Sequence, residues 1–226
     1  MTNHCPEYYH RLLVACGFVK AMDTYSYRAE STHEFPGKYE RVLKRILKNP
    51  AIELRAFSRT HSQHDITIIG ELYNASFVDT WGFVPMNDEE AQALAESFLP
   101  FADLELVWIA YYRGEPAGFI LGLPDLNEIL PALNGRLFPF GIFALLARRR
   151  RISNMRVLAF GVLPKYRSIG IEAALVMKER ERIVTRPYRH AEFSVVMENN
   201  SRMRSLISAF GFQPYRSYRI YQQPIG

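Results

Sequence analysis

Hydrophobic and polar positions follow two different periods along this chain, and together they predict an α/β protein. Apolar residues that alternate with polar ones, or that run together for a few positions, are typical of strands. Such segments are Ile52–Ala56, Leu106–Tyr112, Ala117–Leu123, Val157–Leu163 and Phe193–Met197, with tyrosine-rich strands at Tyr25–Arg28 and Tyr218–Tyr221. Apolar residues three or four positions apart indicate helices. The predicted helices are Tyr8–Cys16, Tyr39–Leu47, Asp65–Tyr73, Asn87–Phe98, Gly170–Val184 and Ser201–Phe210.

Local signals fix several of the boundaries. Asp65 is predicted to cap the helix that follows it, because a short acidic side chain can accept the unpaired first amides. Asn87, with Glu90 three residues later, has the pattern of a capping box. The turn residues Arg113–Pro116 predict a hairpin between two apolar strands. Pro164 ends the run Val157–Leu163, since proline cannot donate the next ladder bond.

The two ends of the chain share a pattern. The segment Leu12–Phe18 matches Leu206–Phe212, and a tyrosine-rich strand follows each. This predicts an internal repeat, although glycine commonly ends helices and chance similarity is the alternative. Residues 1–28 are then the remnant of a preceding domain of the same type, 29–48 a connector with an amphipathic helix, and 49–226 a full domain.

An insertion over residues 127–153 interrupts the full domain. Its apolar stretch Leu137–Ala147 precedes four arginines, Arg148–Arg151. Basic residues suit the carboxyl end of a helix, so the segment is predicted to be a helix packed over the domain. A segment lying on a membrane surface is the alternative.

Composition limits the class of protein without choosing a function. The 226 residues are 48% hydrophobic and 23% charged, as in globular proteins, and the net charge of +5 suits an anionic ligand, nucleic acid or lipid headgroups. No apolar run is long enough to span a membrane, and Met1–Glu7 lacks a secretory signal, so a cytoplasmic protein is expected. Two cysteines form no disulfide framework. His61 and His64 have metal-like spacing but no third ligand, and no metal is predicted.

The stretch from Val157 to Ile171 predicts an anion site. A strand leads through a turn into a helix, and Gly170 stands at the mouth of that helix. The first amides of a helix have no internal partners, and the helix dipole adds positive potential there. Glycine allows a phosphate to approach the backbone closely.

Two motifs resemble those of the GNAT superfamily of N-acetyltransferases. Arg167–Glu172 resembles the coenzyme-binding signature Arg/Gln-x-x-Gly-x-Gly/Ala, with Glu172 in place of the last small residue. Asn200–Phe212 aligns without gaps with the second signature, Asn-x-x-Ala-x-x-x-Tyr-x-x-x-Gly-Phe. The resemblance implies a mixed, mostly antiparallel twisted sheet with helices on both faces and a splayed pair of parallel central strands. The half-repeat at the amino end suggests a bacterial, tandem-domain member whose N-terminal repeat is truncated.

The resemblance also implies how acetyl-CoA, or another acyl-CoA, would bind as cosubstrate. Backbone groups of Phe160 and Val162 would meet the pantetheine arm, and Asn200 would approach it from the next strand. The diphosphate would lie in the loop formed by Tyr166, Arg167, Ser168, Ile169, Gly170 and Ile171.

Catalytic groups are predicted on the same basis. An amine must lose a proton before it attacks a thioester, and a carboxylate is the usual base. Glu198 is preferred to Glu192, because it lies nearer the level of the coenzyme loop; a solvated strand-end glutamate is the alternative. The family's general-acid tyrosine corresponds to Ile207 here, and Tyr215, or else Tyr218, is its predicted replacement.

The predicted activity is acyl-CoA-dependent N-acyl transfer to an amine of a small molecule or peptide. The acceptor pocket is expected at Trp81, Phe83, Asp125 and Asn127, together with the apolar insertion. The alternative is a weak or inactive acyl-CoA-binding domain, favoured by Glu172 and Ile207. A homodimer is allowed, a membrane span is not expected, and no basic–aromatic motif predicts nucleic-acid binding.

Overall fold

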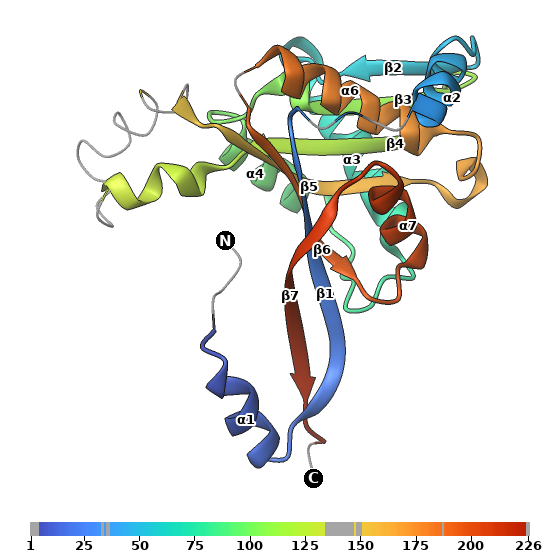
Figure 1. Ribbon diagram of the computed structural model, residues 1–226. Helices are drawn as coiled ribbons and strands as arrows, with labels where there is room; N and C mark the ends of the chain where they lie inside the picture. The colour runs from blue at the N-terminus through green and yellow to red at the C-terminus, as the bar shows by residue number, and fades with distance from the viewer. Residues whose placement is uncertain are drawn as a thin grey trace. The chain divides into compact units, whose positions relative to one another are not determined.

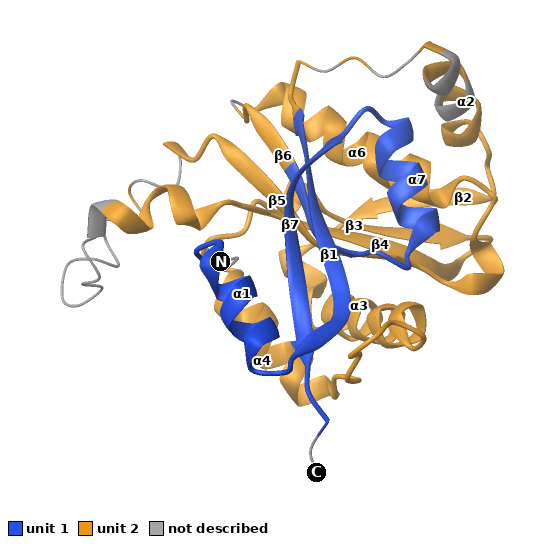
Figure 2. Ribbon diagram, turned by 60° about the horizontal axis from the view of Figure 1, so that its bottom comes forward, with its two compact units in different colours: residues 1–29, 192–226 blue, residues 30–191 orange. Residues whose placement is uncertain are grey.

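The computed structural model describes residues 5–32, 34, 37–133, 147, 151–186 and 188–224. They form two compact units (Figure 2): the large unit, residues 30–191, and the terminal unit, residues 1–29 with 192–226. Residues 192–226 group with the start of the chain because strands from these two segments pair. The division into a repeat remnant, a connector and a full domain stays a prediction.

The large unit contains a four-stranded antiparallel sheet (Figure 1). Its strands are β2 (Ile52–Ala56), β3 (Val107–Tyr112), β4 (Glu115–Pro124) and β5 (Asn154–Val162), in that order. The predicted hairpin between β3 and β4 is confirmed. Its two turn residues, Arg113 and Gly114, have φ angles of 51° and 83°. Two successive positive φ angles are typical of a turn whose twist matches that of the strands.

Helices cover both faces of this sheet. On one face lie α3 (Ser62–Phe77) and α4 (Asp88–Phe98), and on the other lie α6 (Ile171–Thr185) and, packed against it, α2 (Gly37–Leu47) (Figure 1). Ile68 and Leu72 of α3 pack on Ile109 and Phe119 of the sheet. Short 3₁₀ turns occupy Arg59–His61, Leu104–Leu106, Leu126–Glu128, Leu130–Leu133 and Pro164–Tyr166.

The start of α3 corrects one prediction. Asp65 does not cap this helix, which begins at Ser62. Its carboxylate is fully buried and accepts hydrogen bonds from Arg55 at 2.7 and 2.9 Å and from the Ser58 amide at 3.0 Å. Burial alone would raise the pKa of Asp65, but the bonds from Arg55 hold it below its usual value. The residue therefore ties α3 to β2 as an ion pair.

The predicted capping box of α4 is confirmed. Asn87 accepts a bond from the Glu90 amide at 2.8 Å, and Glu90 accepts one from the Asn87 amide at 2.9 Å. These reciprocal bonds satisfy two amides at the amino end of the helix.

The two ends of the insertion meet. The carboxylate of Glu128 accepts bonds from the amides of Ser153 at 3.0 Å and Asn154 at 2.6 Å. The predicted helix Leu137–Ala147 and the arginines Arg148–Arg151 lie outside the described residues, apart from Ala147 and Arg151.

The terminal unit contains α1 (Tyr8–Ala15), β1 (Val19–Glu30), α7 (Ser201–Ala209), β7 (Gln213–Gln222) and most of β6 (His190–Met197). Strand β1 pairs antiparallel with β7, from Val19 opposite Gln222 to Arg28 opposite Gln213. The predicted splayed parallel pair consists of strands now called β5 and β6. These two strands fall largely in different units, and their pairing stays a prediction.

The helix–strand segments of the terminal unit end in matched caps. Gly17 and Gly211 have φ angles of 84° and 82°. The Phe18 amide donates to the Leu13 carbonyl at 3.0 Å, and the Phe212 amide donates to the Ile207 carbonyl at 3.2 Å. Both helices therefore end in the same left-handed glycine motif.

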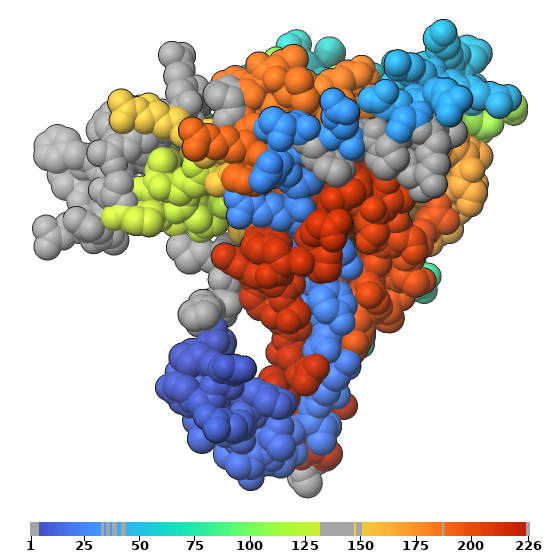
Figure 3. Space-filling model, viewed as in Figure 1, coloured from blue at the N-terminus to red at the C-terminus, as the bar shows by residue number. Residues whose placement is uncertain are grey.

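The two helices differ in burial. No residue of α1 is buried, and Tyr8, Leu12 and Val14 are exposed, as the surface in Figure 3 shows for this helix in dark blue. In α7, Ile207 is only 2% exposed. The matched sequence patterns thus produce matched caps, whereas the surroundings of the two helices differ.

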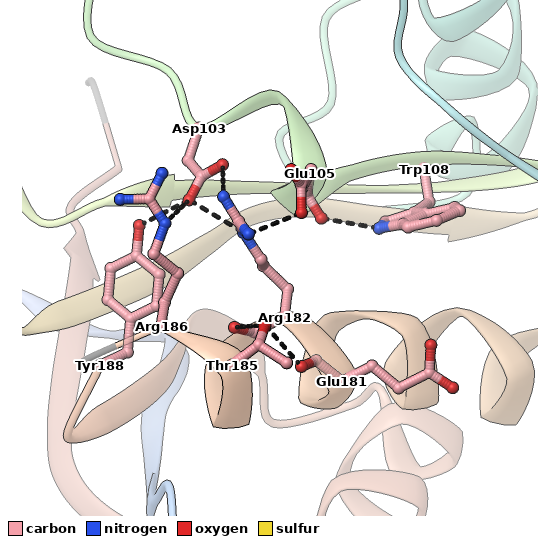
Figure 4. Close-up of polar contacts among 8 residues, drawn as sticks. All are labelled: Asp103, Glu105, Trp108, Glu181, Arg182, Thr185, Arg186 and Tyr188. Carbon is pink, nitrogen blue, oxygen red and sulfur yellow. Dashed lines mark hydrogen bonds and ion pairs between the residues drawn. The ribbon is translucent and has the colours of Figure 1, made fainter.

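A network of charges fastens the carboxyl half of α6 to the start of β3 (Figure 4). The Arg182 guanidinium donates to Asp103 at 2.9 and 3.2 Å and lies 2.6 Å from a Glu105 oxygen. Tyr188 donates its hydroxyl to Asp103 at 3.1 Å. Burial and the Asp103 charge both raise the pKa of Tyr188 above its usual range.

One buried carboxyl group has no such partner. Glu179 of α6 is 3% exposed, and neither of its oxygens has a hydrogen-bond partner among the described residues. It lies over Gly122 of β4, where a Cβ atom would come within 2.8 Å of a Glu179 oxygen. Burial, and secondarily the charge of Asp103, raises the pKa of Glu179 well above its usual value.

Replacing Glu179 with methionine is expected to stabilise the protein at neutral pH by about 1–3 kcal/mol, because a desolvated polar group is removed. The pKa of Glu179 is higher in the folded than in the unfolded protein. The free energy of unfolding of the parent therefore falls as the pH rises from the unfolded-state pKa toward the folded-state pKa. The advantage of the variant should therefore grow as the pH rises above the usual glutamate pKa of about 4.3, and urea denaturation measures it.

Glu181→Met is the matched control, since Glu181 lies on the same helix with its side chain 51% exposed. It should show no comparable gain. A Glu179→Met variant that is less stable than the parent at every pH would contradict the prediction.

Candidate functional site

Strand β5 contains a β-bulge. Leu121 of β4 pairs with Ala159, whereas the next residue, Gly122, pairs with Val157. Leu158 is therefore the extra residue, and it has no ladder partner on β4. Its side chain is 47% exposed. A bulge of this kind leaves backbone polar groups available and re-aims a side chain, features common beside active sites.

The loop after β5 has an unusual backbone. Ser168 has a φ angle of 80° and Gly170 one of 97°. A left-handed conformation is uncommon for a residue other than glycine, and such strain often occurs at functional sites. Gly170 is the N-cap of α6 and provides no capping side chain. The first amides of α6 therefore suit an external acceptor such as a phosphate.

Gly170 also makes a contact that the sequence did not predict. A Cβ atom here would lie 2.5 Å from Cδ1 and 2.9 Å from Cγ1 of Ile46 in α2. The space that glycine leaves open on this side is thus filled by α2. The glycine is required by both its left-handed backbone and this close approach.

Two charged residues of the loop are held by the protein. Arg167 donates to the carbonyl of Val162 at 3.1 Å and to that of Ser76, at the end of α3, at 3.3 Å. Its positive charge is thereby fixed beside the loop. Glu172, in the first turn of α6, is 8% exposed. An acid in the first turn of a helix is favoured by the helix dipole.

The other predicted coenzyme residues of the large unit are mostly buried. Phe160, Val162, Tyr166 and Ile171 have buried side chains, whereas Ser168 is exposed and Ile169 half-buried. The Tyr166 hydroxyl donates to Glu115, which also pairs with Lys165. The buried residues can reach a ligand through their backbone groups alone, as predicted for Phe160 and Val162.

A cavity of about 580 Å³ lies on the face of the sheet covered by α3 and α4. Leu158 and Ala159 of the bulge line it, together with Val107 of β3 and Leu121 of β4. Its lining is almost entirely apolar. No pattern in the sequence indicated this cavity, because its residues also have the spacing of an ordinary core.

The predicted acceptor residues lie outside this lining, although their loop borders it. Val84 and Pro85 line the cavity, and Phe83 packs against Tyr73 with ring centroids 5.7 Å apart. Trp81 is 42% exposed. Asp125 accepts a bond from the Asn127 amide at 3.2 Å, and this pair caps the turn Leu126–Glu128 at the end of β4.

The predicted catalytic residues belong to the terminal unit. Glu198 lies 2.6 Å from the Lys20 ammonium and accepts a bond from the Asp23 amide at 3.2 Å. The bond from Lys20 lowers the pKa of Glu198, which makes it a weaker base. Asp23 itself is held by Arg219, whose hydrogen bonds lower the pKa of Asp23 to about 2.

The remaining predicted residues have structural partners in the same unit. The Tyr215 hydroxyl bonds to Glu192. Asn200 caps α7 by accepting a bond from the Met203 amide at 3.0 Å. Ile207 is buried. The sequence analysis preferred Glu198 to Glu192, but Glu192 is the carboxylate to which Tyr215 bonds.

The described residues contain neither a metal-binding cluster nor a helix that could span a membrane. No group of three or more histidine, cysteine, aspartate or glutamate side chains there is placed to hold a metal ion. None of the described helices is both long and apolar enough to cross a membrane.

The arrangement defines a class of protein: the chain has the fold of the GCN5-related N-acetyltransferases. A GCN5-related N-acetyltransferase from Sphaerobacter thermophilus superposes with a TM-score of 0.59 and 17% identity, covering 94% of this chain and 55% of that one. No protein-family model matches.

Two curated relatives match the whole chain. One, from Caulobacter vibrioides, is named bacterial ceramide synthase and is 29% identical over 231 aligned positions. The other, Protein YghO of Escherichia coli, is 28% identical over 233 positions. The chain spans 60% and 59% of the lengths of these relatives.

Proposed function

We propose that this protein transfers an acyl group from acyl-CoA to an amine and so forms an amide. The observation that carries the proposal is the continuous run from the Leu158 bulge to the amino end of α6. Both features lie in the large unit, on a chain with the fold of N-acetyltransferases. The bulge offers unpaired backbone groups to an acyl thioester, and the helix end suits the diphosphate of the coenzyme.

In this reaction the amine nitrogen attacks the thioester carbonyl, the carbon–sulfur bond breaks, and the coenzyme leaves as a thiolate. The proton lost by the amine passes to a base or to water. Glu198 is the proposed base and Tyr215 the proposed proton donor to the thiolate. The lowered pKa of Glu198 keeps it ionised at neutral pH, so it is in the proton-accepting form.

The similarity to a protein named bacterial ceramide synthase supports an apolar amine as acceptor. A ceramide is an amide formed from a fatty acid and a long-chain amino alcohol. We therefore extend the proposed acceptors from small molecules and peptides to amines that carry an alkyl chain.

We also propose that α1 and β1 are the closing helix and strand of a second repeat, as the sequence predicts. The matched glycine caps and the antiparallel pairing of β1 with β7 support this. The exposed apolar residues of α1 are those that such a repeat would cover.

A non-catalytic acyl-CoA-binding domain is the second candidate. It is favoured by buried Ile207, which cannot donate a proton, and by the engagement of Glu198 with Lys20. A thiolate leaving group needs little assistance, so these features do not preclude turnover.

Two measurements test the proposal in sequence. Calorimetric titration with acetyl-CoA should show binding, and its absence at millimolar ligand would contradict both candidates. Release of coenzyme thiol in the presence of a panel of amines then separates the enzyme from the binder. Glu198→Gln should lower turnover about 10²-fold or more while leaving coenzyme affinity unchanged. Turnover equal to that of the parent would reject Glu198 as the base.

A further inference from the structure

The cavity on the α3–α4 face of the sheet is much larger than an acetyl group requires. We propose that it binds an aliphatic chain, and that this chain is the acyl group of a long-chain acyl-CoA. The proposal rests on the acyl transfer proposed above and names the class of its donor.

The size of the cavity is unusual for a protein interior. Protein interiors are packed as densely as organic crystals, with few voids larger than a water molecule. An apolar cavity of about 580 Å³ therefore indicates space kept for a ligand, and its size is that of a small-molecule site.

The lining of the cavity has few polar side chains, and the most polar of them are Glu90 and Tyr73. Glu90 accepts the Asn87 amide in the capping box, and Tyr73 packs against the rings of Phe77 and Phe83. A polar ligand would find few partners, whereas an alkyl chain needs none.

The position and length of the cavity also suit an acyl chain. The lining begins at Leu158 and Ala159, where the bulge would hold the acyl carbonyl, and continues past Leu121 of β4 to Val107 of β3. Neighbouring strands lie about 4.8 Å apart, so this path is roughly 10 Å long. An acyl chain that starts at the bulge can therefore run across the sheet beneath α3 and α4.

Small residues leave this space open. Gly70 of α3 faces Ala91 of α4, and a Cβ atom on Gly70 would lie 3.5 Å from that of Ala91. Ala95, one turn further along α4, also lines the cavity and is half-buried. Large side chains at positions 91 and 95 would fill the path of the chain.

The first test is a calorimetric series on the full chain with free coenzyme A and its acetyl, octanoyl and lauroyl thioesters. Affinity should rise from acetyl to lauroyl, by up to about fourfold for each methylene buried. If coenzyme A and acetyl-CoA bind but affinity does not depend on chain length, the cavity proposal is overturned and the proposed function stands. If none of the four binds, the proposed function itself fails.

The second test uses variants of one helix. Ala95→Phe should lower the affinity for lauroyl-CoA at least tenfold and leave the affinity for acetyl-CoA unchanged. Ala93→Phe is the matched control, because Ala93 is exposed on the same helix and does not line the cavity. Ala91→Phe provides a second blocked variant if Ala95→Phe fails to fold. Equal losses of lauroyl-CoA affinity in Ala93→Phe and Ala95→Phe would contradict the proposal.

A third experiment distinguishes the acyl chain of the donor from an alkyl chain of the acceptor. Dodecylamine is titrated into the parent and into Ala95→Phe. If the variant no longer binds dodecylamine but still binds lauroyl-CoA, the cavity holds the alkyl chain of the acceptor, and the assignment to the donor is wrong. If it loses lauroyl-CoA alone, the assignment to the donor is supported.

Discussion

Replacing Gly170 with alanine should lower the free energy of unfolding by about 3 kcal/mol and abolish measurable coenzyme binding. A left-handed backbone costs a residue with a Cβ atom about 1–2 kcal/mol. The new methyl group would also press on Ile46, 2.5 Å away, and overpacking typically costs about 1–3 kcal/mol. Both effects displace the loop whose amides are proposed to hold the diphosphate.

Two further variants separate these contributions. Gly114→Ala is the control for backbone strain, because Gly114 has a φ angle of 83° and nothing lies within 4 Å of its Cβ position. It should cost about 1–2 kcal/mol and leave coenzyme affinity unchanged. The double variant Gly170→Ala/Ile46→Ala should recover affinity that the single variant lost, because Ile46 no longer blocks the methyl group.

Urea denaturation gives the stabilities, and calorimetry with acetyl-CoA gives the affinities. If Gly170→Ala binds acetyl-CoA as tightly as the parent, the loop is not the coenzyme site. If the double variant binds no better than Gly170→Ala, the contact with Ile46 does not control the loop.

The second large effect is expected at Asp103. Replacing it with asparagine should destabilise the protein by about 3 kcal/mol, because Arg182, only 14% exposed, loses a buried anionic partner. Glu105 remains near Arg182, but its side chain is 62% exposed and so compensates little. The pKa of Tyr188 should fall toward its usual range, since one of the groups that raise it is removed.

Glu181→Gln provides the comparison, because it breaks an exposed ion pair with Lys178 on the same helix. A loss below about 1 kcal/mol is expected there. Urea denaturation measures both variants, and ultraviolet titration follows Tyr188 through the difference between parent and variant. Similar losses at positions 103 and 181 would show that burial does not set the strength of the network.

The sequence predicted the positions of the strands well because period-two patterns and turn residues are local. The hairpin at Arg113–Gly114 and the capping box at Asn87 follow from residues at most three positions apart. Asp65 was misassigned for the opposite reason: its partner Arg55 lies on strand β2, and no helical signal identifies it. A capping residue and an ion-pair residue look alike until the fold brings the arginine near.

The candidate site was predictable in its loop but not in its shape. Gly170 and Arg167 stand in a short recognisable motif. The Leu158 bulge depends on the register with β4, and an apolar residue within an apolar run carries no sign of it. The cavity was equally unpredictable from the sequence, since leucine and alanine at helical spacing are typical of any core. Contacts across the fold, such as Ile46 against Gly170, were likewise unpredictable.

The pairing of β1 with β7 has a consequence for how the protein is made. The two strands are far apart in sequence, so their ladder can close only after β7 has left the ribosome. Until β7 is available, the backbone groups of β1 that pair with it are free to pair with strands of other molecules. Pairing over such long sequence separation is intrinsically slow. During synthesis the terminal unit should therefore fold after the large unit, and until then it should be prone to aggregation.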